Sequence, residues 1–420
     1  MKTLDQIAAE LQGYDPKALR ADTVNAFLSR LVTPVAQTQT LALFDALDRI
    51  LAQDIVSPIS VPPHDNSAMD GFAFDGAQLG PEKLTLKVVG TALAGPAWQG
   101  SVGKGECLKI MTGAVLPVGL NTVVPQEFTQ IDGDDVLIPP GVLQRGDNRR
   151  LCGEDLMQGQ PAMRRGERIT PAALGLIASL GLSHVEVYRR VRVAYFSTGD
   201  EILSLGDTPR EGAVYDSNRY TVFGLLTRLG VEVIDMGVVK DDPVALKVAF
   251  NTAAAKADAI ITSGGVSVGE ADHTKAMMRE LGDVAFWRIA MRPGRPMAVG
   301  RAGGAVLFGL PGNPVAVMVT FLAFVRPALL RLMGASSAPA PLLQAASLEP
   351  LRKKPGRTEY QRGVVSRNAA SQLTVKTTGN QGSGVLSSMV QANGLIVLHH
   401  DQGNVAVGDP VDVMMFDGAI

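Results

Sequence analysis

The chain has 420 residues, of which 46% are hydrophobic and 19% are charged, and its 39 Lys and Arg residues nearly balance its 41 Asp and Glu residues. This length predicts about two to four folded domains, and the composition excludes a disordered chain and a nucleic-acid-wrapping protein. The two cysteines are too few for a disulfide framework, and Asp5 and Glu10 interrupt any signal-peptide core, so we expect a cytoplasmic protein without a membrane or nucleic-acid partner.

The first half of the chain changes pattern twice. Residues 1–58 have apolar residues at helical spacing, which predicts two or three helices, the last one running from Ala42 to Ile50. Residues 59–154 contain short alternating runs between Gly and Pro, which favour a small antiparallel β-domain. A helix is then predicted from Pro171, with Thr170 as its N-cap and Gly181 as its stop.

The second half is more regular. From 190 to 335 predicted strands alternate with predicted helices, as a parallel sheet with crossover helices requires. The most apolar stretch, Val315 to Val325, is too short for a membrane span, so we expect a buried helix closed by Arg326-Pro327. Residues 340–420 are again strand-like with Gly turns, which predicts a small β-barrel or sandwich.

Three Gly-containing loops, at 197–201, 262–269 and 309–314, each follow a predicted strand of the 190–335 section. Ligands of open α/β sheets bind outside the carboxyl ends of the strands, so we expect the three loops to form one site. Gly264 and Gly265 would let backbone N–H groups approach an anion at a helix N-terminus. None of the loops is a Walker A or GxGxxG sequence, so neither nucleoside triphosphate hydrolysis nor dinucleotide binding is supported.

The middle loop also contains a literal GxSxG around Ser267, the nucleophile pattern of α/β-hydrolases. A serine hydrolase is therefore an alternative function. Its triad needs a downstream histidine, but His273 is too close to Ser267, and His399 and His400 fall in what we expect to be a separate β-domain. The pattern disfavours this alternative.

Carboxylates and cations lie near the same loops. Hard cations that also bind substrate phosphates need a few carboxylate oxygens, so a Mg²⁺ site is reasonable, although Asp242 and Asp272 are also placed to cap helices. Two prolines stiffen the segment from Arg292 to Pro296, and its two guanidinium groups suit a tetrahedral oxyanion. The acidic candidates are Asp200, Glu201, Asp241, Asp242 and Asp272, and the basic ones are Lys275, Arg288, Arg292, Arg295 and Arg357.

Nine motifs in sequence order resemble the MoeA family, the molybdopterin molybdenumtransferases, to which the gephyrin E domain and the plant molybdenum insertase E domain are related. The motifs are DNSAMDG (65–71), MTGA (111–114), GED (153–155), STGDE (197–201), YDSN (215–218), KDDP (240–243), SGGVSVGEAD (263–272), RPGRP (292–296) and GLPGNPV (309–315). Relatives commonly have lysines where this chain has Arg292 and Arg295, which leaves the choice between molybdate and tungstate open.

The resemblance implies a multidomain α/β plus β fold. A helical, discontinuous N-terminal domain (1–58 and 155–189) would carry the inserted β-domain (59–154). A MogA-like three-layer α/β domain with a parallel-rich sheet (190–335) would bind molybdopterin, and a β-barrel (336–420) would follow. The resemblance also implies a homodimer with its active site across the interface. A molybdopterin adenylyltransferase and molybdoenzyme chaperones are possible further partners.

The activity that the resemblance implies is insertion of molybdate into adenylylated molybdopterin, with Mg²⁺-dependent release of AMP. A carrier that binds molybdopterin without turnover is the other alternative. The implied catalytic residues are Asp70, Thr112, Glu201, Asp241, Asp272 and Lys275, with Glu201, Asp241 and Asp272 on the metal and with Asp70 and Thr112 approaching from the second protomer. The implied cofactor-binding residues are Ser263, Gly264, Gly265, Ser267, Pro311, Gly312, Asn313 and Pro314, and the implied molybdate ligands are Arg292, Arg295, Arg357 and Ser383.

Overall fold

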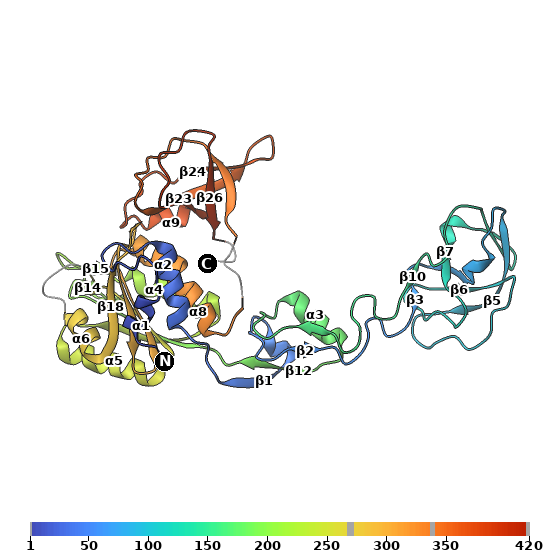
Figure 1. The fold of residues 1–420 in the computed structure, drawn as a ribbon, viewed down its shortest axis with the longest axis horizontal. Coiled ribbons are helices and arrows are strands. Elements are labelled where there is room, and N and C mark those ends of the chain that lie inside the picture. Colours follow the sequence, from blue (N-terminus) through green and yellow to red (C-terminus); the bar gives the residue numbers. More distant parts are fainter. Residues whose placement is uncertain (1, 267–272, 337–340, 417–420) are drawn as a thin grey trace.

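The chain builds an elongated molecule whose two ends differ in architecture (Figure 1). The computed structural model describes residues 2–266, 273–336 and 341–416. An α/β body and the C-terminal barrel stand together at one end, and a β-sheet domain stands at the other. A narrow connection, residues 38–58 and 155–188, joins the two ends, and we call it the arm.

The α/β body is built on a six-stranded sheet in the order β16-β13-β17-β21-β20-β18. The first four strands are parallel, as predicted, whereas β20 runs antiparallel to β21 and β18 pairs antiparallel with β20. The sequence analysis did not predict β18 or β20, because the Pro and Gly residues at 293–296, which lie between the two strands, indicate a loop. The bounds are β16 (Glu232–Val239), β13 (Arg192–Thr198), β17 (Ala259–Ser263), β21 (Ala305–Leu310), β20 (Pro296–Ala302) and β18 (Gly282–Arg288).

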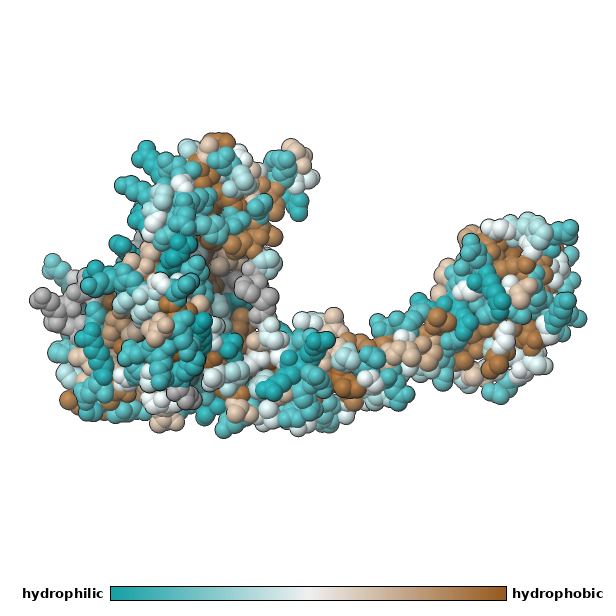
Figure 2. Space-filling model, in the orientation of Figure 1, coloured by the Kyte–Doolittle hydropathy of each residue, from teal (hydrophilic) through white to brown (hydrophobic). Residues whose placement is uncertain are grey.

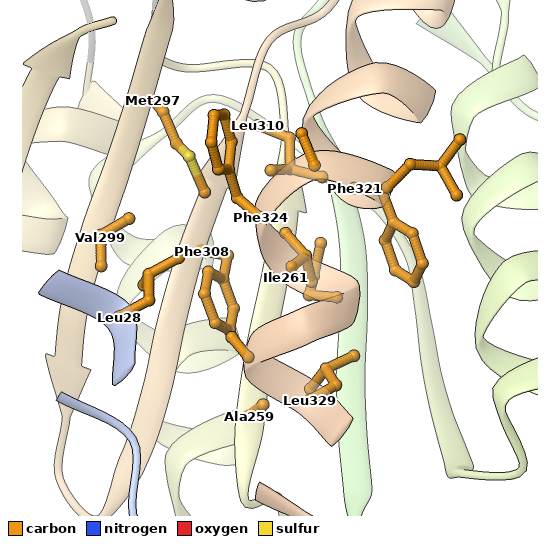
Figure 3. Close-up of a cluster of buried hydrophobic side chains, with 14 of the residues drawn as sticks. Leu28, Ala259, Ile261, Met297, Val299, Phe308, Leu310, Phe321, Phe324 and Leu329 are labelled. Atoms are coloured by element: carbon orange, nitrogen blue, oxygen red, sulfur yellow. The ribbon is translucent and has the colours of Figure 1, made fainter. Parts of the chain in front are cut away.

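Helices cover both faces of this sheet, which makes the body a three-layer α/β domain. Successive residues of a strand point to opposite faces. Accordingly, Tyr195 of β13 packs in the cluster with α4 and the helix after β21, whereas Phe196 packs in the cluster with α5 and α6. Figure 3 shows part of the first cluster. The helices are α4 (Ser217–Leu229), α5 (Pro243–Lys256) and α6 (His273–Leu281).

The helix after β21 runs through α7 (Pro314–Thr320), a π-helical turn (Phe321–Val325) and α8 (Arg326–Leu332). Pro314–Leu332 is long and apolar enough to cross a membrane by length and composition alone, but 72% of its most apolar window is buried inside the protein. It packs on the sheet as a core helix (Figure 3). The expected stop at Arg326-Pro327 is wrong. A π turn directly precedes the proline, and the wider spacing of such a turn relieves the clash that proline causes inside an α-helix.

The N-terminal region contains α1 (Leu4–Ala9) and α2 (Ala21–Leu31), but the third predicted helix is wrong. Residues 38–42 form β1 instead, which pairs antiparallel with β12 (His184–Tyr188), and a short 3₁₀ turn follows at Leu43–Ala46. Pairing with a distant strand overrides the helical spacing here. The helix predicted after Thr170 is confirmed as α3 (Pro171–Ser179), with the Thr170 side chain accepting from the Ala173 N–H.

The distal domain is a six-stranded sheet in the order β7-β4-β6-β5-β9-β8. It is antiparallel, as expected, except for the parallel pair β5–β6. The strands are β7 (Thr122–Pro125), β4 (Gly71–Phe74), β6 (Glu106–Ile110), β5 (Leu84–Ala92), β9 (Asp135–Ile138) and β8 (Gln130–Asp132). Two-stranded ladders elsewhere are β2 (Ile55–Val56) with β11 (Pro161–Met163), β3 (Asn66–Ser67) with β10 (Arg149–Arg150), and β14 (Ile202–Leu203) with β15 (Val214–Tyr215).

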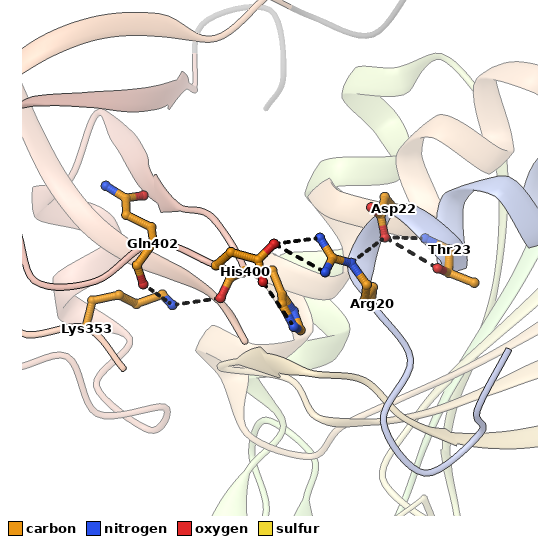
Figure 4. A network of polar contacts seen from close by, with 7 residues as sticks. Arg20, Asp22, Thr23, Lys353, His400 and Gln402 are labelled. Carbon is orange, nitrogen blue, oxygen red and sulfur yellow. Dashed lines mark hydrogen bonds and ion pairs between the residues drawn. The ribbon is translucent and has the colours of Figure 1, made fainter. Parts of the chain in front are cut away.

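The C-terminal region is the predicted barrel, closed by five strands in the order β23-β24-β22-β26-β25 and back to β23. A sixth strand, β19 (Met291–Arg292), comes from the α/β body and pairs with β23. Arg20 at the start of α2 also forms a salt bridge of 3.3 Å with Asp401 of the barrel (Figure 4). The remaining elements are β23 (Thr358–Arg367), β24 (Leu373–Thr377), β22 (Leu343–Ser347), β26 (Pro410–Met415), β25 (Gly394–Leu398) and α9 (Ser387–Gln391).

Candidate active site

A cavity of about 750 Å³ opens at the carboxyl ends of β13, β17 and β21. All three Gly-containing loops reach it, and the barrel contributes residues 381–384 to its wall. The structure therefore brings together loops that are more than 100 residues apart in sequence, because the carboxyl ends of neighbouring parallel strands meet at one edge. The predicted site residues that line the cavity are Glu201, Ser263, Gly264, Gly265, Arg292, Arg295, Pro311, Gly312, Asn313, Pro314 and Ser383.

The Gly264-Gly265 turn is packed too tightly for any side chain. Both residues have positive φ angles, of 90° and 64°. A Cβ atom on Gly264 would lie 2.3 Å from the Thr198 carbonyl oxygen, and one on Gly265 would lie 2.4 Å from the Thr274 Cβ atom. The two glycines are thus required by contact with the end of β13 and the start of α6, in addition to any role in exposing backbone N–H groups.

A buried triangle of hydroxyl groups holds Ser263 at the cavity wall. The Tyr195 hydroxyl lies 2.7 Å from Ser263 Oγ and 2.9 Å from Ser197 Oγ, and the two serine oxygens are 3.3 Å apart. Burial raises the pKa of Tyr195 well above its ordinary value, so this hydroxyl keeps its proton. The two contacts of Ser263 join β17 to the neighbouring parallel strand β13, which holds this part of the wall in place.

Asp241 does not line the cavity, but two hydroxyl groups connect it to the wall. Thr274 Oγ1 donates to Asp241 Oδ1 over 3.2 Å and lies 3.0 Å from Thr198 Oγ1. Because Thr274 has one hydroxyl proton and gives it to the carboxylate, Thr198 must donate to Thr274. Thr198 itself lines the cavity. Asp242 next to it caps α5 by accepting from the Val244 and Ala245 N–H groups, which confirms the capping role considered for it.

The cationic side of the cavity consists of Arg292 and Arg295. Both side chains are exposed, and neither forms a salt bridge within the part of the chain that the structure describes. The barrel adds Ser383, whose carbonyl oxygen accepts from the Val315 N–H over 3.1 Å. Two uncompensated guanidinium groups beside backbone and hydroxyl donors form a site suited to an oxyanion.

Arg357 does not line the cavity; its guanidinium forms a 2.7 Å salt bridge with the buried carboxylate of Glu359. The sequence analysis missed Arg362, which is 1% exposed and donates to the carbonyl oxygens of Asn380 and Gly382 and to Ser388 Oγ. Arg362 thereby holds the loop that carries Ser383. The sequence contains one signal for its burial: Arg362 is two residues from Tyr360 on the same strand, and residues at this spacing face the same side of a sheet.

Burial lowers the pKa of Arg362 to about 10, and the charge of Arg292 adds to this shift. The group therefore remains a cation near neutral pH. Its hydrogen-bond acceptors are carbonyl and hydroxyl oxygens, so its positive charge is not cancelled by them.

Other predicted site residues lie elsewhere. Asp70 accepts from the N–H and the hydroxyl of Thr112 over 2.6 and 2.7 Å, which lowers the pKa of Asp70. Both belong to the distal domain, at the opposite end of the molecule from the cavity (Figure 1). Lys275 lies on α6 with its ammonium group 5.9 Å from the Phe286 ring centre, outside the cavity lining. Ser267 and Asp272 are outside the described residues.

Two negative findings concern metal and histidine chemistry. Within residues 2–266, 273–336 and 341–416, no three His, Cys, Asp or Glu side chains gather as a metal cluster. His399 of the barrel bonds to Asp412 over 2.7 Å and is not part of the cavity lining. The structure thus provides no histidine beside the cavity for the hydrolase alternative among the residues it describes.

Three protein-family profiles match successive parts of the chain. Residues 19–181 match the MoeA N-terminal region (domain I and II), residues 194–331 match a probable molybdopterin binding domain, and residues 344–416 match the MoeA C-terminal region (domain IV). The first profile begins after α1, and the second contains all three Gly-containing loops.

Curated relatives and solved structures agree with these profiles. A molybdopterin molybdenumtransferase from Haemophilus influenzae is 41% identical over 382 residues, which cover 91% of this chain and 94% of the relative. One from Nostoc is 34% identical and covers 96% of this chain and 95% of the relative. The molybdopterin biosynthesis moeA protein of Pyrococcus horikoshii superimposes with a TM-score of 0.80 at 26% identity, covering 95% of this chain and all of that structure.

Proposed function

The chain belongs to the MoeA family of molybdopterin molybdenumtransferases, and from this premise we propose that it transfers molybdenum from molybdate to molybdopterin during molybdenum cofactor biosynthesis. The observation that carries the proposal is the cavity at the strand ends, which combines tightly turned Gly loops and a carboxylate with two arginines that form no salt bridge among the described residues. An anionic pterin and an anionic metal oxide need such a pairing of backbone donors and fixed cations.

We further propose that the pterin arrives adenylylated and that AMP is released as molybdenum is transferred. Cleavage of a phosphoanhydride depends mainly on positioning and charge neutralisation, so it needs neither a histidine base nor a cysteine nucleophile. Backbone N–H groups of the loops at 263–266 and 311–314 would bind the phosphates, and Arg292 and Arg295 would bind molybdate. Ser383, held in place through Arg362, would donate to a molybdate oxygen.

Mg²⁺ fits this site as an ion held largely by substrate phosphates. Mg²⁺ keeps several waters and usually takes one or two protein carboxylates, so a preformed cluster of three is not required. Glu201 lines the cavity, and Asp241 has its carboxylate oriented by Thr274. These two residues, with Asp272 outside the described part, would hold the ion, which neutralises phosphate charge when bound.

We also propose that the active unit is a homodimer with sites shared between protomers. The distal domain, which carries Asp70 and Thr112, lies at the opposite end of the molecule from the cavity (Figure 1). These residues cannot act in the cavity of their own chain, so we infer that a two-fold partner supplies them. Apolar patches on the arm support such an interface (Figure 2). The exposed apolar residues there include Phe44, Leu47 and Val56. We also propose that the enzyme acts in the cytoplasm. It would act after an adenylyltransferase that supplies the substrate and before chaperones that receive the cofactor.

An anaerobic single-turnover experiment tests the proposed function. Adenylylated molybdopterin, Mg²⁺ and molybdate are mixed with the protein, and AMP release and molybdenum incorporation are followed. We expect molybdate-dependent AMP release that is lost in Glu201→Gln and retained in Glu211→Gln, an exposed carboxylate outside the cavity. Substrate binding without AMP release by any of the three proteins would support a carrier instead of an enzyme.

A further inference from the structure

Two buried side chains at the start of α4 line the cavity, and each has an oxygen that no donor among the described residues reaches. Asp216 is 3% exposed and Asn218 is 7% exposed. Oδ2 of Asp216 and Oδ1 of Asn218 are buried, and no donor reaches either of them within the described part of the chain. A buried acceptor without a donor is unfavourable, so both atoms are stabilised when a ligand supplies N–H groups.

The other polar atom of each side chain is already occupied, which fixes its position. Asp216 is the N-cap of α4, and its Oδ1 accepts from the Arg219 N–H over 3.1 Å. Asn218 Nδ2 donates to the Gly312 carbonyl oxygen over 2.7 Å. This last bond assigns the amide orientation, so the free atom of Asn218 is its oxygen. The start of α4 therefore holds two fixed acceptor oxygens in the cavity wall.

Polar residues from the start of α4, from the segment before α7 and from the barrel contribute to the cavity wall. Residues 312–315, at the start of α7, contact the start of α4 through Gly312 and the barrel loop through Val315 and Ser383. The segment at the start of α7 thus contacts both the start of α4 and the barrel loop. Arg292 belongs to the barrel side, since β19 pairs with β23 of the barrel. The cavity wall therefore offers a ligand both acceptors, on α4, and cations, at Arg292 and Arg295.

We infer that Asp216 and Asn218 bind the N–H edge of the pterin ring and so orient the substrate in the cavity. A pterin has its 2-amino group next to the ring N3–H, two donors side by side that match a carboxylate and an amide oxygen. The molybdate then lies toward Arg292 and Arg295, as in the proposed function. This inference rests on the proposed function, from which it takes the pterin.

Competition binding tests the inference. Anaerobic equilibrium dialysis measures the affinity for molybdopterin, and 6-hydroxymethylpterin and 6-hydroxymethyllumazine serve as competitors. Lumazine has a carbonyl oxygen in place of the 2-amino donor, so we expect the wild-type protein to bind the pterin about tenfold or more tightly than the lumazine. Asp216→Asn keeps a capping oxygen but replaces the free acceptor with an NH₂ donor. We expect it to abolish this preference and to weaken molybdopterin binding by about tenfold or more.

The matched control is Asp242→Asn, which makes the same change at the N-cap of α5, away from the cavity lining. It should keep the wild-type preference. If Asp216→Asn lowers the melting temperature markedly, the preference for the pterin competitor is measured instead in Asn218→Ala, which removes the second acceptor. Binding of molybdopterin without preference between the two competitors, or a preference that survives both variants, would overturn the inference and leave the proposed function standing. Failure of the wild-type protein to bind molybdopterin would instead refute the proposed function.

Discussion

The hydroxyl of Thr274 donates a hydrogen bond to the carboxylate of Asp241 across a distance of 3.2 Å. Asp241 follows β16, and Thr274 lies in the first turn of α6, so the contact joins two elements on one face of the central sheet. The uncharged hydroxyl of Thr274 thus orients the carboxylate of Asp241, a residue of the proposed metal site. This relationship leads to the first of four predictions.

Thr274→Val should lower the single-turnover rate of AMP release by about threefold to tenfold, because one hydrogen bond that orients Asp241 is lost. Valine has nearly the volume of threonine, so the contact with Gly265 is kept. Thr274→Ser, which retains the hydroxyl, should restore most of the rate. Equal rates for Thr274→Val and the wild-type protein at limiting Mg²⁺ would show that the hydroxyl does not position the carboxylate.

Gly265→Ala should destabilise the protein by about 2 to 4 kcal/mol, because alanine would have to adopt the positive φ of this position and its Cβ atom would collide with Thr274. Denaturant unfolding of the α/β body measures this change. Gly224→Ala is the control: Gly224 lies within α4, and a Cβ there meets no atom within 4 Å. It should stabilise the protein by about 0.5 to 1 kcal/mol, since glycine is a poor helix former. Equal stability of the two variants would contradict the packing argument.

Arg362→Lys should raise the molybdate concentration needed for half-maximal turnover by about tenfold or more, because lysine cannot reproduce the several hydrogen bonds that hold the Ser383 loop. Arg357→Lys should have a much smaller effect, since Arg357 lies outside the cavity lining. Molybdopterin affinity, measured separately, should stay close to wild type in both variants. A larger effect at Arg357 would support its role as implied by the family resemblance.

The pair between Arg189 and Asp258 should make stability depend on acid pH. Burial by itself raises the pKa of Asp258, but two 2.7 Å bonds from Arg189 and one from the Arg192 N–H outweigh burial and lower it below the ordinary 3.8. A lowered folded-state pKa means that this stabilisation is present above a pH of about 4 and is lost as the pH falls through the folded-state value.

Asp258→Asn should therefore cost about 2 kcal/mol of unfolding free energy at neutral pH and progressively less below a pH of about 4. Urea titrations of both proteins at a series of pH values measure the difference. A cost that stays constant across this range would mean that the ionised carboxylate is not the source of the stabilisation.

Much of the site was predictable because it follows from local rules applied to parallel strands. Loops after β13, β17 and β21 had to meet, since the carboxyl ends of adjacent parallel strands lie at one edge. Thr170, Pro171 and Gly181 likewise predicted α3, because capping chemistry is local. The motifs in sequence order predicted the family, which the profiles and relatives confirm.

The errors and omissions have a common physical origin in long-range contact. The helical spacing at 42–50 is overridden by contacts with distant segments, because Ala42 pairs with His184 at the end of β1 and Ile50 forms a bridge to Arg168. The role of Arg362 depends on the loop at 380–384, which folds over it and accepts its hydrogen bonds. The salt bridge between Arg357 and Glu359 likewise becomes visible only in the structure, and the role of Arg357 in molybdate binding stays a prediction. Asp70 and Thr112 were recognisable as a pair of motifs, but their separation from the cavity depends on the length and direction of the arm.

Residue order alone therefore established the strand-loop-helix periodicity, the glycines of the binding loops and the family. These features depend on neighbours within a few residues, whose geometry is set by backbone sterics and hydrogen bonding. The partners of Arg357 and Arg362, the hydroxyl link to Asp241 and the unpaired oxygens of Asp216 and Asn218 arose only on folding. A side chain's hydrogen-bond partners and burial are properties of its three-dimensional surroundings, and segments far apart in the sequence supply those surroundings.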